Sequence, residues 1–299
     1  MRFANLAGRA AVLLTDDQGN DRVIDVHTAS DGWFGPDPAD CYEQWDALRA
    51  WADGAELTAD SPNAAPIDPN ELGAPSPSPR QSFGIGLNYA AHAAESGATN
   101  PEFPPTFTKF PTCITGPFAT VELPSDTVDW EVELVAVIGR RAHRVAAADA
   151  WAHIAGLTVG QDLSERTVQL RPPAPQFSLG KSYPGFGPTG PWLVTPDAVP
   201  NPDDLALSCT VDGETMQSSR TSDLIFSIPL LIEKLSSITP LLPGDVIFTG
   251  TPSGVGMARK PPRFLKPGEV IVTTIEGIGS ITTTLVAAEV MVTHLSANA

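Results

Sequence analysis

One ten-residue segment, DWEVELVAVI at positions 129–138, constrains the fold of this chain more than any other part. Side chains two apart in a β-strand point to the same face of a sheet, so Glu131 and Glu133 stand side by side. The opposite face, from Trp130 to Ile138, is wholly apolar. Adjacent carboxylates repel each other and resist desolvation, and a bound cation would reverse both costs. The segment predicts a strand that offers two ligands to a cation. The alternative is an exposed, acid-rich strand edge.

A third carboxylate follows in the segment GQDLSERTVQ, where Asp162 precedes Arg166 and Gln169. No cysteine lies near these carboxylates, and oxygen ligands of this kind are typical of hard cations. Together with the paired glutamates, Asp162 therefore predicts a site for Mg²⁺ or Mn²⁺. For this aspartate alone, an unrelated surface position is the alternative.

The composition excludes several classes of partner and site. The 299 residues carry a formal net charge of −17, whereas nucleic acids and anionic membranes both demand a basic surface. We expect neither as a partner, although local basic residues can still bind a small anion. The three cysteines are far apart and form no CxxC pair, so neither zinc nor a disulfide framework is indicated. The apolar run at 10–14 is too short for a signal-peptide core, which predicts a cytoplasmic protein without a membrane span.

The chain divides near residue 75 into a small N-terminal unit and a larger domain. In the small unit, Ala10–Leu14 and Val23–Val26 predict a β-hairpin, and Asp40–Ala52 has the apolar spacing of a helix. The proline-rich stretch SPNAAPIDPNELGAPSPSPR then forms a connector. We expect residues 1–75 to form a small β-rich domain with this linker, and residues 76–299 to form the domain that carries the metal and the chemistry.

Strand-like runs dominate the larger domain, at Gln81–Gly86, Glu131–Ile138, Ile154–Gly160, Leu205–Val211, Asp245–Thr249, Val270–Ile275 and Ser280–Val286. The best helix candidate is Asp223–Ser236, where Pro229 must lie in a first turn or kink the helix. Many strands without regular βα alternation favour a mixed, β-rich α+β fold over a Rossmann sheet.

The segment GLNYAAHAAE at positions 86–95 carries a candidate acid–base pair. His92 and Glu95 lie three residues apart, which places them on one face of a short helix or turn. A carboxylate that accepts from one imidazole nitrogen leaves the other nitrogen free to take a proton from water. The alternative is a solvated helix with an incidental His–Glu pair. The pair gains weight only if this segment folds over the metal.

Two further loops carry candidate binding groups. Lys181 lies in QFSLGKSYPGFGPTGP, where little else is charged, and a lysine near a metal can bind a substrate oxygen or stabilise a developing enolate. An ordinary surface lysine is the alternative. In LPGDVIFTGTPSGVG, backbone N–H groups could hold a carboxylate with help from the Thr251 hydroxyl. A tight bend that needs glycine is the other interpretation, and the two are compatible.

Taken together and in this order, these segments resemble the fumarylacetoacetate hydrolase family. The resemblance covers about residues 81 to 285. It rests on the segments GLNYAAHAAE, TFTKFPTCITGP, DWEVELVAVIGR, GLTVGQDLSERTVQ, QFSLGKSYPGFGPTGPWLV, MQSSRTSDLIFSIPLLIEKLS and LPGDVIFTGTPSGVG. The order of the linked motifs makes the match far more specific than any one of them. Residues 1–75 match only loosely, as the smaller N-terminal domain that many members carry.

The resemblance implies a catalytic domain of mixed β-rolls, usually dimeric, with Mg²⁺ or Mn²⁺ bound by carboxylates. The roles it implies are metal ligation by Glu131, Glu133 and Asp162, water activation by His92 with Glu95, an active-site lysine at Lys181, substrate-side contacts from Arg166 and Gln169, and anion binding near Thr251. Family members often have Asn before the metal-binding Asp and Asp just after the Arg. Here those positions are Gln161 and Thr167, a departure that bears on substrate or rate rather than on metal ligation.

The resemblance also implies an enzyme that hydrolyses a carbon–carbon bond in an acylpyruvate or a related 2,4-dioxo acid. The expected substrate is a small anionic 2-oxo acid from the catabolism of aromatic compounds, and the expected assembly is a homodimer. Isomerases, hydratases and decarboxylases of 2-oxo dicarboxylic acids share the metal and the enolate, so this alternative stays open. A non-catalytic relative is a third hypothesis, and the intact set of polar residues speaks against it.

Overall fold

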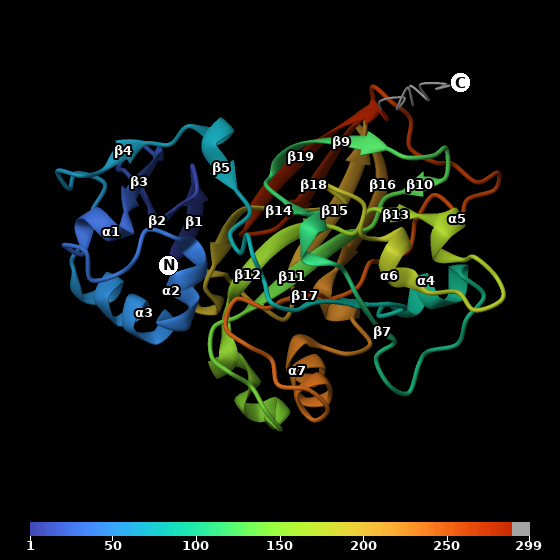
Figure 1. Cartoon of the computed structure of the whole chain (residues 1–299), viewed down its shortest axis with the longest axis horizontal. Coiled ribbons are helices and arrows are strands. Elements are labelled where there is room, and N and C mark those ends of the chain that lie inside the picture. The colour runs from blue at the N-terminus through green and yellow to red at the C-terminus, as the bar shows by residue number, and fades with distance from the viewer. Residues whose placement is uncertain (289–299) are drawn as a thin grey trace, which may run out of the picture.

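The computed structural model describes residues 1–288 and is rich in strands (Figure 1). The strands are β1 (Arg2–Leu6), β2 (Arg9–Thr15), β3 (Asp21–Asp25), β4 (Ala65–Pro66), β5 (Leu72–Gly73), β6 (Ser82–Ile85), β7 (Thr106–Thr108), β8 (Ile114–Thr115), β9 (Phe118–Leu123), β10 (Val128–Asp129), β11 (Val132–Ile138), β12 (Ile154–Gln161), β13 (Ser164–Glu165), β14 (Gly187–Val194), β15 (Ala206–Val211), β16 (Glu214–Arg220), β17 (Val246–Phe248), β18 (Val270–Ile275) and β19 (Gly279–Ala287). The α-helices are α1 (Val26–Ala29), α2 (Pro38–Glu43), α3 (Trp45–Gly54), α4 (Ala90–Glu95), α5 (Arg166–Gln169), α6 (Phe177–Gly180) and α7 (Ile228–Ser236).

Two sheets organise the molecule. The larger, twelve-stranded sheet has the order β4-β3-β2-β1-β14-β12-β11-β17-β6-β7, with β5 beside β1 and β8 beside β14. The second sheet has the order β16-β15-β18-β19-β9. Helices are few and short, and α4, α5 and α6 lie at the end of the molecule opposite to the N-terminal elements (Figure 1). The prediction of a mixed, β-rich α+β fold is confirmed.

Strand β11 lies at the centre of the larger sheet, paired with β12 and β17, and each of its residues is buried. Its alternate side chains enter two different cores, as the two-residue period requires. Leu134 and its same-face neighbours pack in the core that includes Leu207 and Ile271 of the second sheet. Val135 packs with Tyr42 of the N-terminal helices. This double burial excludes the exposed strand edge that the sequence had left open.

The N-terminal unit contains the predicted hairpin, because β2 and β3 pair antiparallel. The predicted helix at 40–52 is instead two helices, α2 and α3, which are separated at Gln44. The backbone of Gln44 leaves the helical region, with φ −122° and ψ 26°. The break lets the Tyr42 and Trp45 rings stack with centroids 5.2 Å apart, a contact that spacing alone does not reveal.

The larger sheet runs from the N-terminal unit into the rest of the chain. Strand β1 pairs antiparallel with β14, and Phe3 lies opposite Leu193. The unit formed by residues 1–75 therefore shares a continuous hydrogen-bonded ladder with the later residues. A domain boundary near residue 75 stays a prediction.

The seven strand-like runs of the larger domain all contain strands, at β6, β11, β12, β15, β17, β18 and β19. The predicted helix at 223–236 begins later, at Ile228, and Pro229 lies in its first turn as expected. Sequence patterns missed β14, whose sequence GPTGPWLV reads as a loop. Its pairing with β12 shifts register between Leu157 and Val159, which accommodates prolines that cannot donate to a regular ladder.

The three cysteines, Cys41, Cys113 and Cys209, are free and buried. Within residues 1–288, no helix has both the length and the hydropathy needed to cross a membrane.

Candidate active site and metal centre

Strand pairing brings three carboxylates together at the end of β11. Glu133 lies on β11, Glu131 directly precedes it, and Asp162 directly follows the neighbouring strand β12. Val132 pairs with Gln161 in the ladder, and the Asp162 N–H donates to the Glu131 carbonyl at 2.9 Å. Glu131, Glu133 and Asp162 offer oxygen atoms that all lie within 4.8 Å of one another, and the three residues are buried. The structure thus places the three predicted metal ligands in one cluster.

Buried cations hold two of these carboxylates. The Lys181 ammonium donates to Glu131 and to Asp162, each at 2.6 Å. The Arg166 guanidinium bonds Asp129 and Glu131, with its Nη2 at 2.8 Å from an oxygen of each. Lys181 is 2% exposed, so the alternative of a surface lysine is excluded.

A second buried lysine, Lys109, was missed by sequence reasoning. Its side chain is fully buried, and its ammonium donates to Asp162 at 2.6 Å, to the Phe186 carbonyl at 3.1 Å and to the Lys181 carbonyl. The available signal was one lysine inside the segment TFTKFPTCITGP, which the family resemblance included without a role. Because Lys109 contacts both an expected metal ligand and the backbone of Lys181, we interpret it as the residue that positions them.

Glu133 is the carboxylate of the cluster that has no cationic partner among the described side chains. Its carboxylate accepts from the Gly250 N–H at 2.7 Å. Burial, and then the negative charges of Asp162 and Glu131, raise the pKa of Glu133 well above its usual range. Burial also raises the pKa of Glu131, but Lys181 and Arg166 outweigh it and hold that pKa below its usual range.

This imbalance fits a divalent cation. A buried carboxylate beside two others is costly unless positive charge is added, and all the converging donor atoms are carboxylate oxygens. Such ligands suit hard cations such as Mg²⁺ and Mn²⁺. Glu131, Glu133 and Asp162 are therefore the residues that would hold the ion.

Two glycines make this packing possible. Gly250 has φ 109°, in the left-handed region that favours glycine, and its N–H is the donor to Glu133. Gly180 ends α6, where a Cβ atom would lie 2.6 Å from the Gln169 nitrogen and 2.8 Å from the Glu165 carbonyl oxygen. This close approach of α6 to α5 brings Lys181 next to Arg166 and the carboxylates.

The His–Glu pair forms on α4 as its spacing predicts. His92 Nδ1 lies 2.8 Å from Glu95 Oε1, and the Gly254 N–H donates to both Glu95 oxygens at 3.1 and 2.9 Å. The histidine is 8% exposed, which excludes a solvated, incidental pair. Glu95 thus links α4 to the glycine-rich loop, and the other imidazole nitrogen of His92 forms no hydrogen bond with the described side chains.

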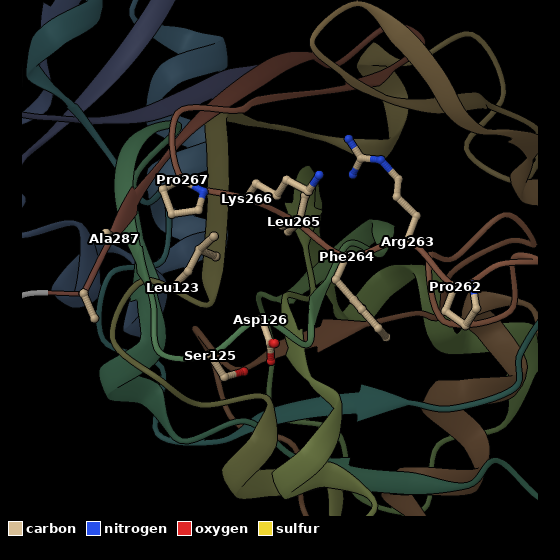
Figure 2. Close-up of a pocket in the computed structure, with 11 residues that line it drawn as sticks. Leu123, Ser125, Asp126, Pro262, Arg263, Phe264, Leu265, Lys266, Pro267 and Ala287 are labelled. Carbon is tan, nitrogen blue, oxygen red and sulfur yellow. The ribbon is translucent and has the colours of Figure 1, made fainter.

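One pocket of about 290 Å³ joins the histidine to the carboxylate cluster. Six predicted site residues line it, namely His92, Glu131, Arg166, Gln169, Lys181 and Thr251. The pocket is completed by Ile85, Gly86, Leu87, Ser96, Phe107, Leu170, Phe177 and Met257. A second pocket, of about 620 Å³, lies between the loop 262–267 and the chain around Ser125 (Figure 2). None of the eleven residues that line this second pocket is a predicted site residue.

The glycine-rich loop after β17 binds carboxylates of the protein itself. Besides the Gly250 and Gly254 contacts, the Gly256 N–H donates to Asp129 at 2.7 Å. Thr251 donates to the Val132 carbonyl at 2.9 Å and accepts from Gln217 at 2.8 Å. These N–H groups thus fix the site's own acidic residues, and a contact between Thr251 and substrate stays a prediction.

Gln161 is one of the two departures from the family pattern, and its side chain holds the backbone of the expected metal ligand Glu131. Its side-chain oxygen accepts from the Glu131 N–H at 2.9 Å, and its amide donates to Thr273 at 2.9 Å. The other departure, Thr167, forms a hydroxyl contact with Thr127 at 2.9 Å. Gln161 therefore spans from the first sheet to the second and helps to orient Glu131.

The chain is similar in sequence and in structure to known proteins. The model of the fumarylacetoacetate hydrolase C-terminal family matches residues 81–286. A bovine protein named mitochondrial oxaloacetate tautomerase FAHD2A is 47% identical over 199 residues, which cover 66% of this chain and 63% of the bovine one. The match thus spans just under two thirds of that relative's length.

Solved structures extend the likeness over nearly the whole chain. A candidate HpcE protein from Mycobacterium smegmatis is 52% identical with a TM-score of 0.89, covering 97% of this chain and 100% of the other. Maleylpyruvate hydrolase from Sphingobium, solved with manganese and pyruvate, is 27% identical with a TM-score of 0.76, covering 97% of this chain and 100% of the other. The fold, the site geometry and these matches together establish that the chain belongs to the fumarylacetoacetate hydrolase family.

Proposed function

We propose that this protein is a divalent-metal-dependent enzyme that interconverts the enol and keto forms of small 2-oxo acids. The observation that carries this proposal is the shared pocket, in which His92 faces the Glu131–Arg166–Lys181 cluster. An imidazole oriented by a carboxylate can move a proton at carbon, and buried cations can stabilise the charge that develops on oxygen. Neither step requires a bond between carbons to break.

In this proposal, different residues of the chain carry out the two proton transfers. His92, held by Glu95, removes a proton from the carbon next to the 2-oxo group and returns it in the reverse direction. The electron pair of the broken C–H bond forms the C=C bond, and the former carbonyl oxygen takes up a proton to become the enol. Lys181 is the adjacent donor for that oxygen. When bound, the metal would supply Lewis-acid polarisation of the 2-oxo group.

The relatives support this choice of reaction. Bovine and human proteins that are 46–47% identical are named oxaloacetate tautomerases. A structural relative from Mycobacterium abscessus, 30% identical with a TM-score of 0.76, is described as a 2-hydroxyhepta-2,4-diene-1,7-dioate isomerase. Proton transfer next to a 2-oxo group is common to both reactions.

Hydrolysis of a carbon–carbon bond in an acylpyruvate is the second candidate. It is favoured by the maleylpyruvate hydrolase among the structural relatives and by the buried His92–Glu95 pair, which could equally activate water. In this reaction water adds to the distal carbonyl, and the bond to the 2-oxo side breaks to leave an enolate. A role in the catabolism of aromatic compounds and a cytoplasmic location also stay predictions.

A substrate panel separates the two candidates. Oxaloacetate and acetylpyruvate are each assayed with Mg²⁺, with Mn²⁺ and with EDTA. Enol–keto exchange is followed by the ultraviolet absorbance of the enol, and hydrolysis by the release of pyruvate. We expect exchange without pyruvate release beyond the uncatalysed rate, and we expect EDTA to abolish it. Stoichiometric pyruvate and acetate from acetylpyruvate would instead establish the hydrolase, and no turnover of either acid would contradict both.

Loss of one metal ligand should weaken metal binding strongly. Removing even an outer contact of a metal ligand typically costs 10- to 100-fold in affinity, so Asp162→Ala should cost at least about 100-fold for Mn²⁺. Isothermal titration of the metal-free protein measures this. Asp149→Ala, at an exposed aspartate, is the matched control and should bind as the parent does. Equal affinity of Asp162→Ala and the parent would disprove the ligand assignment.

We also propose a homodimer, chiefly because the family resemblance implies one. Light scattering at micromolar concentration should give about twice the chain mass. A stable monomer of 31.5 kDa would refute this proposal without affecting the site itself.

A further inference from the structure

We propose that Asp129 is a positioning residue, which fixes the direction from which the Arg166 guanidinium meets the carboxylate of a 2-oxo acid. The inference rests on the proposed function, because that function brings the acid to the pocket that Arg166 lines. The metal cluster and the His–Glu pair leave Asp129 without a role, although this aspartate is fully buried.

The Asp129 carboxylate is occupied on both oxygens by N–H donors. Its Oδ1 accepts from the Trp130 N–H at 2.8 Å and from the Gly256 N–H at 2.7 Å. Its Oδ2 accepts from the Met257 N–H at 2.9 Å, and from Nε and Nη2 of Arg166 at 3.0 and 2.8 Å. An ionised carboxylate offers about four lone-pair sites, and all these donors share them. No oxygen is left for a metal, which separates Asp129 from the three expected metal ligands.

The same contacts fix the guanidinium of Arg166. Its Nε and Nη2 both donate to one Asp129 oxygen, and Nη2 also lies 2.8 Å from Glu131 Oε1. Its Nη1 donates to the Gln169 side-chain oxygen at 2.9 Å. Among residues 1–288, these contacts leave the second N–H of Nη1 without an acceptor. Because Arg166 lines the pocket, that N–H is the donor available to a substrate carboxylate.

Asp129 also ties this guanidinium to the glycine-rich loop. The Gly256 and Met257 N–H groups bond the same carboxylate, and Met257 lines the pocket. A Cβ atom on Gly256 would lie 1.9 Å from the Arg263 carbonyl oxygen and 2.8 Å from Asp129 Oδ1, so this close approach requires glycine. One buried carboxylate thus holds the loop and the guanidinium in a single arrangement.

Charge and position make opposite predictions for the loss of this carboxylate. Asp129→Asn keeps the shape of the side chain and removes one negative charge beside the pocket. Long-range electrostatics alone would then strengthen the binding of an anion. Whichever way the new amide turns, however, its NH₂ group faces N–H donors, and its neutral oxygen holds a guanidinium less strongly. If Asp129 acts by position, the binding of a 2-oxo acid therefore weakens.

Titration of the Mn²⁺-loaded protein with pyruvate measures the affinity for the 2-oxo acid end alone. In Asp129→Asn we expect binding at least about tenfold weaker than in the parent, a loss typical of a hydrogen bond to a charged group. Equal or tighter binding would overturn the inference, and so would a parent protein that does not bind pyruvate.

Asp245→Asn is the matched control. Asp245 is also fully buried, accepts from the Gln81 and Leu242 N–H groups at 2.9 and 2.7 Å, and does not line the pocket. This variant should bind pyruvate as the parent does. A loss equal to that in Asp129→Asn would show that any buried aspartate acts through the fold, and would overturn the inference.

Metal affinity shows whether Asp129 contributes a ligand. Because its oxygens are already occupied, Mn²⁺ affinity should fall far less in Asp129→Asn than in Asp162→Ala. Isothermal titration of the metal-free variants measures both. A loss in Asp129→Asn as large as that in Asp162→Ala would make Asp129 a metal ligand and would overturn the inference.

A double-variant cycle tests whether Asp129 acts through Arg166. Arg166→Met removes the guanidinium, and in that background Asp129→Asn should weaken pyruvate binding no further, because the two residues act as one unit. The double variant also removes both partners of the buried pair, which costs less stability than leaving one of them unpaired. Additive losses of affinity would show that Asp129 acts elsewhere, and would overturn the inference.

Turnover separates this inference from the proposed function. For enol–keto exchange of oxaloacetate, Asp129→Asn should raise KM by a larger factor than it lowers kcat, because Arg166 holds the carboxylate in the ground state and in the transition state alike. A fall in kcat with unchanged KM would overturn the inference. No exchange in the parent protein would contradict the proposed function, and the pyruvate titration would still decide the inference.

Discussion

Replacing His92 by alanine should lower kcat by about 10²- to 10⁴-fold, which is the usual contribution of a positioned acid–base group. The histidine lines the pocket, and Glu95 fixes its ring at 2.8 Å while the Gly254 N–H fixes Glu95. Because His92 is not one of the expected metal ligands, Mn²⁺ affinity should stay nearly unchanged. Enol–keto exchange of acetylpyruvate under saturating Mn²⁺, with isothermal titration of the metal, measures both quantities.

Two further variants, one at an exposed histidine and one at Glu95, make this result specific to His92. His143 is exposed, so His143→Ala should keep parental activity. Glu95→Gln should keep the shape of α4 and weaken the orientation of the ring, and the double variant should be little worse than His92→Ala because the two residues act as one unit. Parental kcat in His92→Ala would rule out the proposed base. Loss of pyruvate release with retained enol–keto exchange would favour the hydrolase, with His92 as its water-activating group.

Replacing Lys109 by methionine should lower the free energy of unfolding of the metal-free protein by about 3–5 kcal/mol. Removing one partner from a buried ion pair leaves an uncompensated charge, and losses of this size are typical. Here the ammonium donates to Asp162 at 2.6 Å and to two backbone carbonyls, and all of these groups lose a donor. Methionine retains most of the side-chain volume, so the change reports on charge and hydrogen bonding rather than on a cavity.

Chemical denaturation of the parent and two variants tests this expectation. Lys260 is exposed, and Lys260→Met should change the stability by less than about 0.5 kcal/mol. A similarly small loss of stability in Lys109→Met would mean that Lys181 alone compensates the charge of Asp162. In that case Lys109 would not be the residue that positions the cluster.

Local patterns in the sequence determined several parts of the site. The two-residue period of a strand placed Glu131 beside Glu133, and the helical spacing of three placed His92 beside Glu95. Both pairs are found in the structure as predicted. The residues themselves also pointed to Asp162 and Lys181 as candidates. The resemblance to a family then gave roles to Arg166 and Gln169 and joined all four to one site, a grouping that no local period could reveal. Such pairs are readable from sequence because neighbours in one element share its geometry.

The tertiary structure alone decided how these pieces meet. Asp162 reaches Glu131 because β12 pairs with β11 after the connection formed by residues 139–153. Lys109 reaches Asp162 from 53 positions away. The one lysine in the segment TFTKFPTCITGP was a weak signal, because a lysine in such a segment is equally consistent with a surface position. The same holds for Leu170 and Leu179, which look alike in the sequence, although only Leu170 lines the pocket. Contacts of this kind depend on long-range strand pairing and close loop packing, which residue spacing along the chain does not encode.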